Sequence, residues 1–98
     1  MKGTIVGKVS CRIYKYSRVV QAYLNKDIRN LLNCDDIVFN CAKLIIKRAS
    51  IDSKRTHSIK SKYFTFVPRS GDLEDYIGSY NVVQVDEDTF ILKKINNG

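Results

Sequence analysis

The chain has 98 residues, of which 44% are hydrophobic, and a formal net charge of +7. At this length it forms one compact domain or two small repeats, neither of which buries enough apolar surface to be stable alone. No apolar run approaches the roughly 20 residues that cross a bilayer, and the N-terminal residues do not resemble a signal peptide. We therefore expect a cytoplasmic protein with no membrane partner.

Two strands are predicted at the N-terminal end of the chain. Residues 4–13 are rich in β-branched side chains and alternate between apolar and polar positions, which is typical of a strand. Residues 19–24 resume this pattern. Between the two strands, cations alternate with tyrosines, and no residue type fixes the point where the chain reverses. The sequence therefore predicts a hairpin with a basic tip.

A short helix is predicted to begin at Lys26. Asn25 or Asp27 can cap its first turn, because a short side-chain oxygen accepts a hydrogen bond from a free backbone N–H. Asn33 follows the last apolar position and can end the helix in a left-handed conformation. The apolar stripe of this helix has the spacing i, i+3 and i+4 and consists of Ile28, Leu31 and Leu32.

Beyond the helix, residues 37–39 and 44–46 are two apolar runs joined by a short connection, which predicts a β-hairpin. Residues 48–58 are polar and turn-prone, and we interpret them as a junction. A strand rich in aromatic residues is then predicted over residues 59–67. It ends at Pro68, which has no N–H to donate to a strand ladder.

The order of these features is repeated about 45 residues later. Residues 72–78 repeat the acidic, aliphatic, polar and apolar pattern of residues 27–33 and predict a second short helix. A second hairpin follows, with its turn at residues 86–88, and like the first it ends on a pair of cations. We therefore predict tandem strand–strand–helix–strand–strand repeats, in residues 1–50 and 51–98. The second repeat has no clear first strand.

The motif of the first repeat is a strand, a turn, an Arg-Val-aliphatic strand, a short helix and a hairpin. It is formed by Met1, Lys2, Thr4, Ile5, Val6, Lys8, Val9, Arg18 to Val20, Leu24 to Arg29, Leu32, Asp36 and Ile45 to Arg48. This pattern resembles an AbrB-type (SpoVT/AbrB-like) DNA-binding domain, and a weaker copy covers about residues 59–95. Pro68 stands at the family's proline position, which Asn25 occupies in the first copy. The chain also has about three residues more than the usual spacing between Val20 and Leu24.

The resemblance implies a mostly β fold with two short helices, in which two repeats exchange hairpins to form one small β-barrel. The barrel can close within one chain, with residues 1–48 and 59–95 as its halves. It can also form between like halves in a homodimer or a higher homo-oligomer. The internal repeat favours the first arrangement, and the uneven distribution of charge favours the second.

The excess positive charge lies entirely in the first half. Residues 1–50 contain ten Lys or Arg and three Asp or Glu, whereas residues 51–98 contain seven of each. Such a segregated charge attracts a polyanion, most commonly nucleic acid. The candidate DNA-binding residues lie around the hairpin tip and the helix start: Lys8, Arg12, Tyr14, Lys15, Tyr16, Arg18, Lys26 and Arg29.

These residues have different expected roles. Lys and Arg can neutralise backbone phosphates, and Arg can also form two hydrogen bonds with a guanine edge. Tyr14 and Tyr16 can hydrogen-bond phosphates, stack on bases, or pack against the hairpin. The resemblance implies that Arg18 and Arg29 occupy basic positions used for DNA contact. Two neighbouring basic positions of the family pattern are Gly7 and Asn30 here, which removes charges from that site.

Catalytic and metal sites are not predicted. The three cysteines include no Cys-x-x-Cys pair, so we expect free thiols. His57 is the only histidine, which leaves no multi-histidine metal site or histidine-based catalytic set. The acids of residues 72–75 are explained by the positive end of the predicted helix. We expect no enzyme activity, no cofactor and no small-molecule substrate.

The function predicted from these features is a transcriptional regulator that binds double-stranded DNA. One alternative is a protein-interaction module, such as an antitoxin of the MazE type, which shares the fold in the resembled family. Another is a protein that binds single-stranded nucleic acid through Tyr14, Tyr16 and Tyr63, because aromatic side chains stack on unpaired bases.

Overall fold

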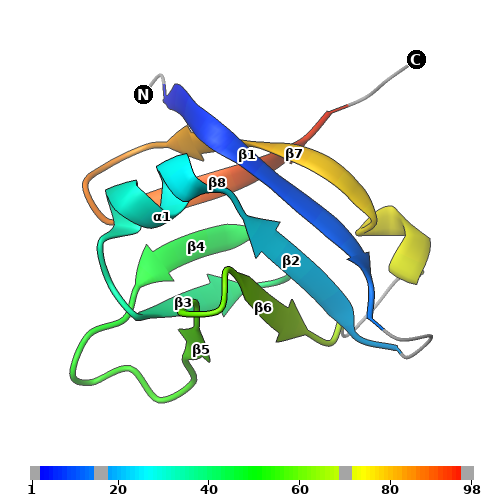
Figure 1. The fold of residues 1–98 in the computed structure, drawn as a ribbon, viewed down its shortest axis with the longest axis horizontal. Helices are drawn as coiled ribbons and strands as arrows, with labels where there is room; N and C mark the ends of the chain where they lie inside the picture. The colour runs from blue at the N-terminus through cyan, green and yellow to red at the C-terminus, as the bar shows by residue number, and fades with distance from the viewer. Residues whose placement is uncertain (1–2, 15–17, 69–71, 96–98) are drawn as a thin grey trace.

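The computed structural model describes residues 3–14, 18–68 and 72–95. The mostly β fold predicted from the sequence is confirmed, because the strands in these ranges form one antiparallel sheet that curls into a nearly closed barrel (Figure 1). The elements in chain order are β1 (Thr4–Ile13), β2 (Val20–Leu24), α1 (Lys26–Leu32), β3 (Asp36–Asn40), β4 (Ile45–Arg48), β5 (His57–Ser58), β6 (Tyr63–Phe66), the 3-10 helix η1 (Leu73–Asp75), β7 (Gly78–Gln84) and β8 (Thr89–Lys94).

The sheet interleaves strands from the two halves of the chain. Its order is β5-β3-β4-β8-β7-β1-β2-β6, and its two end strands, β5 and β6, lie next to each other. The pairs β1–β2, β3–β4 and β7–β8 are hairpins within one half. The pairs β1–β7, β2–β6, β3–β5 and β4–β8 join the two halves. Neither half therefore forms its sheet independently of the other.

The strand order has an approximate twofold symmetry. Exchanging β1 with β5, β2 with β6, β3 with β7 and β4 with β8 leaves the order around the barrel unchanged. The ladder registers agree with this symmetry, because Ile45 of β4 pairs with Ile91 of β8, its counterpart in the sequence repeat. The tandem order read from the sequence thus corresponds to a symmetric arrangement of strands.

The core fills the inside of the barrel. Along β2, every second side chain is buried, and in β1 the buried Val9 and Cys11 alternate with exposed neighbours, as expected for strands with one solvated face. The aromatic part of the core comes mostly from the second half. The buried hydrophobic residues are Val9, Cys11, Val20, Ala22, Leu24, Ile28, Leu32, Ile37, Ile46, Ile59, Phe64, Phe66, Tyr80, Val82, Phe90 and Leu92.

The helix α1 has both predicted ends. The Oδ1 atom of Asn25 accepts a hydrogen bond from the Ile28 N–H at 3.1 Å, which satisfies a free donor of the first turn. Asn33 adopts the left-handed conformation with φ 46° and ψ 46°, and ends the helix. Ile28 and Leu32 are fully buried, whereas Leu31, also placed in the apolar stripe, is 38% exposed. The buried side of α1 is thus narrower than the sequence pattern predicts.

The second helix is shorter than predicted. Only residues 73–75 are helical, as the 3-10 helix η1, and none of them is buried. The side chain of Asp72, which precedes η1, forms no capping hydrogen bond. Gly78 already belongs to β7, where it pairs with Cys11 of β1. Strand pairing therefore takes the residues that would have completed an α-helix.

The first strand of the second half is β5, a two-residue strand that pairs with β3. The strand predicted over residues 59–67 is found only at Tyr63–Phe66. A turn precedes it, in which the Lys62 N–H donates to the Ile59 carbonyl at 3.2 Å. Lys62 itself has a positive φ of 74°. The sequence missed this turn because it contains neither Gly nor Pro.

Candidate nucleic-acid interface

The outer surface of β1, β2 and β6 carries most of the candidate residues that the structure describes. We call this surface the tyrosine face and define it by Lys8, Ser10, Arg12, Tyr14, Gln21, Tyr23, Tyr63 and Thr65. On each strand these positions alternate with buried ones, so their side chains point away from the core. The alternation of residues in β1 and β2 thus separates a solvated surface from the barrel interior.

Two rows of side chains cross the tyrosine face. Ser10, Tyr23 and Tyr63 are directly paired across the three strands, and Arg12, Gln21 and Thr65 form the neighbouring row. Cross-strand neighbours on one face are close enough to interact. The Tyr23 and Tyr63 rings have centroids 5.3 Å apart with an angle of 51° between their planes. In the other row, Arg12 Nε donates a hydrogen bond to Gln21 Oε1 at 3.1 Å.

The surface between these rows is hollowed. One hollow of about 290 Å³ is lined by Ser10, Arg12, Gln21, Tyr23 and Tyr63. A second hollow of about 480 Å³ shares Gln21 and Tyr63 with the first and also includes Tyr14 and Thr65. The combination of aromatic rings, an amide, hydroxyl groups and a guanidinium can stack on bases and hydrogen-bond to bases, sugars or phosphates.

Further cations lie at the end of the tyrosine face where β2 leads into α1. Lys8 lies one residue beyond the Val9–Leu24 pair, and Lys26 begins α1. Lys62 is held beside the same point, because its carbonyl accepts a hydrogen bond from the Leu24 N–H at 2.9 Å. Lys8, Lys26 and Lys62 are all exposed.

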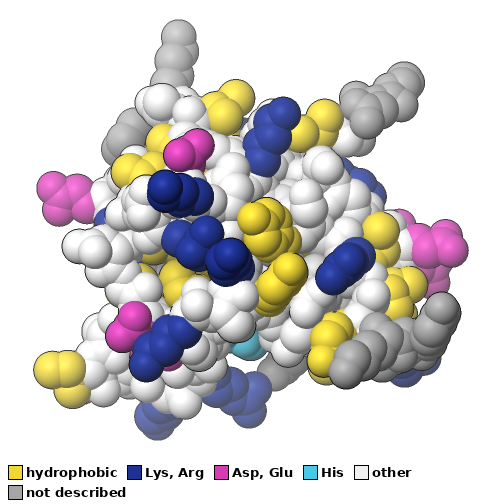
Figure 2. All heavy atoms as spheres, viewed as in Figure 1, with side chains coloured by type: hydrophobic (Ala, Val, Ile, Leu, Met, Phe, Trp, Pro, Cys, Tyr) yellow, Lys and Arg dark blue, Asp and Glu magenta, His cyan; other side chains and the backbone are white. Residues whose placement is uncertain are grey.

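The five neighbouring strands β8, β7, β1, β2 and β6 contain no acidic residue. All ten acids of the chain lie in loops, in or beside the helices, or at the start of β3. In Figure 2, Lys and Arg side chains gather over the region where β2 and α1 lie in Figure 1, with hydrophobic side chains beside them. Acidic side chains lie at the left and right edges of this view and also beside two of the Lys and Arg groups. The outer surface of these strands therefore carries cations without acids, together with the exposed Tyr23 and the half-buried Tyr14 and Tyr63.

The structure brings only some of the predicted site residues together. Lys8, Arg12 and Tyr14 lie on the tyrosine face, and Lys26 lies beside it. Lys15 and Tyr16 lie outside the described residues. The structure also adds four residues that were not among the candidates for duplex binding: Gln21, Tyr23, Lys62 and Tyr63. Only alternation along β2 could have placed Gln21 and Tyr23 on an outer face.

Arg18 and Arg29, the two positions implied by the family resemblance, are less available. Arg18 is exposed, but it lines a hollow together with Asp72 and Glu74, whose negative charges oppose its own. The Nε atom of Arg29 donates a hydrogen bond to the Leu24 carbonyl at 3.2 Å, and the residue is half-buried. Nearby acids therefore offset the charge of Arg18, whereas Arg29 keeps its charge but has its Nε bound to the main chain.

Arg48 is a cation with a structural role. Its Nε and Nη2 atoms donate to the carbonyls of Leu32 and Leu31, both at 2.7 Å, at the end of α1. Its Nη1 atom contacts the Glu87 carbonyl and pairs with Asp88 Oδ1 at 2.8 Å. Arg48 thus ties the first helix to the turn between β7 and β8.

The structure describes all three cysteines, and each is a free thiol. Burial raises the pKa of Cys11 to about 12, and burial also raises the pKa of Cys34. Both thiols therefore stay protonated near neutral pH. Among the described residues, no group of three His, Cys, Asp or Glu side chains is placed to hold a metal ion. In the same ranges, every helix is too short or too polar to cross a membrane.

Comparisons of the chain with protein-family models, curated proteins and solved structures find no match.

Proposed function

We propose that this protein binds double-stranded DNA through the tyrosine face and acts as a transcriptional regulator. The observation that carries the proposal is the outer surface of β1, β2 and β6, which carries Lys8 and Arg12 and contains no acidic residue. Lys8 and Arg12 lie four residues apart on β1, so their Cα atoms are about 13 Å apart along an extended strand. Together with Lys26 and Lys62, they can contact several phosphates at once.

The interleaved strand order supports the AbrB-type resemblance behind this proposal. In that family, two repeats exchange hairpins, and here β1–β2 of the first half is flanked by β7 and β6 of the second. A homodimer would place two tyrosine faces on one assembly and would extend the contact along a duplex. A cytoplasmic location and this dimer are part of the proposal. The mass of the protein in solution tests the dimer directly.

The proposal is tested by binding of a labelled random duplex at several salt concentrations, measured by fluorescence anisotropy. The variant K8A/R12A/K62A should weaken binding by roughly a hundredfold at about 0.1 M salt, because each lost phosphate contact removes about 0.9 from the salt slope. A matched control, K43A/K47A/K54A, removes the same charge from other parts of the molecule and should change the affinity little. Equal losses in the two variants would refute a site on the tyrosine face.

A second candidate function is binding of single-stranded nucleic acid. The observation that favours it is the contact between the exposed Tyr23 and the half-buried Tyr63 on a strand surface, since base–aromatic stacking contributes about 1–3 kcal/mol per base. The variant Y23A/Y63A separates the two candidates. Under the duplex proposal it should bind the duplex nearly as well as the parent protein. If single strands are the partner, the parent should prefer the unpaired strand, and Y23A/Y63A should lose at least tenfold.

A further inference from the structure

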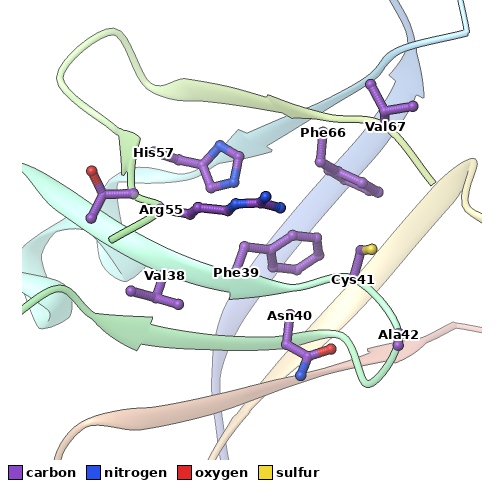
Figure 3. Close-up of a pocket in the computed structure, with 10 residues that line it drawn as sticks. Val38, Phe39, Asn40, Cys41, Ala42, Arg55, His57, Phe66 and Val67 are labelled. Carbon is purple, nitrogen blue, oxygen red and sulfur yellow. The ribbon is translucent and has the colours of Figure 1, made fainter. Parts of the chain in front are cut away.

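A separate pocket opens where the barrel is not fully closed. It has a volume of about 530 Å³ and lies between β3, β5 and β6, at the two ends of the sheet (Figure 3). Small-molecule sites commonly have volumes of about 300–1,000 Å³. We call it the seam pocket. It borders the second hollow of the tyrosine face, with which it shares Thr56 and His57. The β6 side chain that lines it, Phe66, is buried, whereas Tyr63 and Thr65 alternate with it and lie on the tyrosine face.

The walls of the seam pocket are largely apolar and aromatic. Phe39 and Phe66 contact each other with ring centroids 4.7 Å apart, and the His57 ring lies 6.5 Å from that of Phe39. Val38 and Val67 extend the apolar lining, and Val67 is 60% exposed. Burial lowers the pKa of His57, so its imidazole is neutral near pH 7 and adds no charge to the pocket. A flat apolar ligand would bury surface that the fold leaves open to water.

One cation lies within these aromatic walls. In Figure 3, the Arg55 side chain extends between His57 and the rings of Phe39 and Phe66. Among the described residues, none forms a hydrogen bond or an ion pair with Arg55, and none of those that line the pocket is acidic. A guanidinium presents a planar fork of donors that matches a carboxylate. The seam pocket thus combines an apolar slot with one uncompensated anion-binding group.

We propose that the seam pocket binds a small aromatic monocarboxylate. Its ring system would lie against Phe39 and Phe66, and its carboxylate would accept two hydrogen bonds from Arg55. A single carboxylate matches the single cation in charge, and the mostly apolar walls favour a ligand whose remaining surface is apolar. The inference does not require nucleic-acid binding, since the cation and most of the lining come from β3, the loop after it and the residues around β5, and only Phe66 comes from β6.

The test is a titration of the ¹⁵N-labelled protein with 2-naphthoate, followed by amide chemical shifts. Saturable shifts should concentrate in residues 38–42, 55–57 and 66–67. The neutral analogue 2-naphthalenemethanol should bind at least tenfold more weakly, because it cannot pair with the guanidinium. No saturation by 2-naphthoate up to 5 mM, or shifts centred on other residues, would overturn the proposal.

The variant R55Q removes the charge from an exposed position and should leave the fold intact. It should lower the affinity for 2-naphthoate at least tenfold and should change the affinity for 2-naphthalenemethanol little. The matched control is K54Q, which removes the same charge from the adjacent residue and should bind 2-naphthoate like the parent protein. An R55Q protein that binds 2-naphthoate with unchanged affinity would refute the role of Arg55.

Discussion

The two helices, α1 and η1, occupy corresponding places in the repeats but differ in length, capping and burial. α1 has seven residues, a side-chain cap from Asn25 and two fully buried side chains. η1 has three residues, no side-chain cap and no buried residue. The sequences of the two segments share the same pattern of acidic, aliphatic, polar and apolar residues. The difference between the helices must therefore arise outside that pattern.

The neighbouring strands explain the difference. β1 has ten residues and pairs with β7 as far as Cys11 and Gly78, which begins the strand directly after the η1 region. The counterpart of β1 is β5, which has two residues and pairs with β3 only at Asp36 and Ile37. A long strand from the other half thus extends β7 at the expense of a helix. The short β5 does not extend β3 in this way, and α1 keeps seven residues, with Ile28 buried against Gly7 of β1.

The cations that end the two hairpins also differ, because the one in the first half makes more contacts with its helix. Arg48, at the end of β4, contacts the Leu31 and Leu32 carbonyls of α1 and the acidic turn before β8. Lys94, at the end of β8, forms one contact, from Nζ to the Asp75 carbonyl of η1 at 3.1 Å. Both cations lie where the negative end of a helix favours positive charge. The first helix therefore has the stronger attachment to its hairpin.

The largest expected effect compares the buried side chains of the two helices. Ile28→Ala should lower the free energy of unfolding by about 2–5 kcal/mol, because a fully buried side chain is replaced by a cavity. Leu73→Ala, at the corresponding position of η1, should cost about 1 kcal/mol, because that side chain is only partly buried. Urea denaturation of both variants measures the difference. Similar losses would show that η1 contributes as much to the core as α1.

The second prediction concerns the contact between α1 and β1. Gly7 lies at an irregularity in the β1–β7 ladder, and a Cβ atom there would lie 2.6 Å from Ile28 Cδ1 and 2.8 Å from Ile28 Cγ1. Gly7→Ala should therefore destabilise the protein by about 1–3 kcal/mol. In an Ile28→Ala background the same change should cost less than about 0.5 kcal/mol, because the clashing atoms are gone. Additive losses in this double-mutant cycle would contradict the steric explanation.

The sequence predicted those features that depend on neighbouring residues in the chain. Asn25 and Asn33 bound α1 because capping and the left-handed conformation are properties of a few consecutive residues. The hairpins β3–β4 and β7–β8 were predicted for the same reason, and both are present. The resemblance implied exchange of hairpins, and that arrangement depends on contacts between distant parts of the chain.

Features set by the partner strand were not predictable locally. Gly78 fits the end of a helix, but its pairing with Cys11 places it in β7. The two-residue strand β5 has no sequence signal of its own, and it exists because it pairs with β3. The tyrosine face also depends on such pairing, since Tyr63 reaches Tyr23 only through the β2–β6 ladder. Sequence reasoning therefore identified cations more readily than the aromatic pair between them.

The third prediction compares the starts of the two helices. Asn25→Ala should cost about 0.5–2 kcal/mol, because it leaves the Ile28 N–H without its side-chain partner. Asp72→Ala should change the stability by less than about 0.5 kcal/mol, because the Asp72 side chain makes no capping hydrogen bond. Asn25→Asp serves as the control, since aspartate caps equally well. Thermal unfolding of the three variants gives the order of their stabilities. A loss of stability in Asp72→Ala equal to that in Asn25→Ala would contradict the prediction.

The smallest expected effect is a pH dependence of stability that arises from a residue of the second half only. His57 of β5 pairs with Ile37, as Gly7 of β1 pairs with Val82, so only the second half has a titrating group at this position. Burial lowers the pKa of His57 in the folded protein, so the unfolded chain binds the proton more readily. Stability should therefore be highest above the ordinary histidine pKa of about 6.5 and should fall as the pH drops through the folded value.

Urea midpoints at pH 7.5 and 5.5 measure this effect, with His57→Gln as the comparison. Because the carboxylates are common to both proteins, the difference between their pH slopes isolates the imidazole. The parent protein should lose more stability than His57→Gln between the two pH values. Equal slopes would mean that β5 opens readily enough for His57 to be protonated in the folded state. The two-residue β5 would then contribute little to closing the barrel, and the contrast with the ten-residue β1 would be larger than the strand lengths indicate.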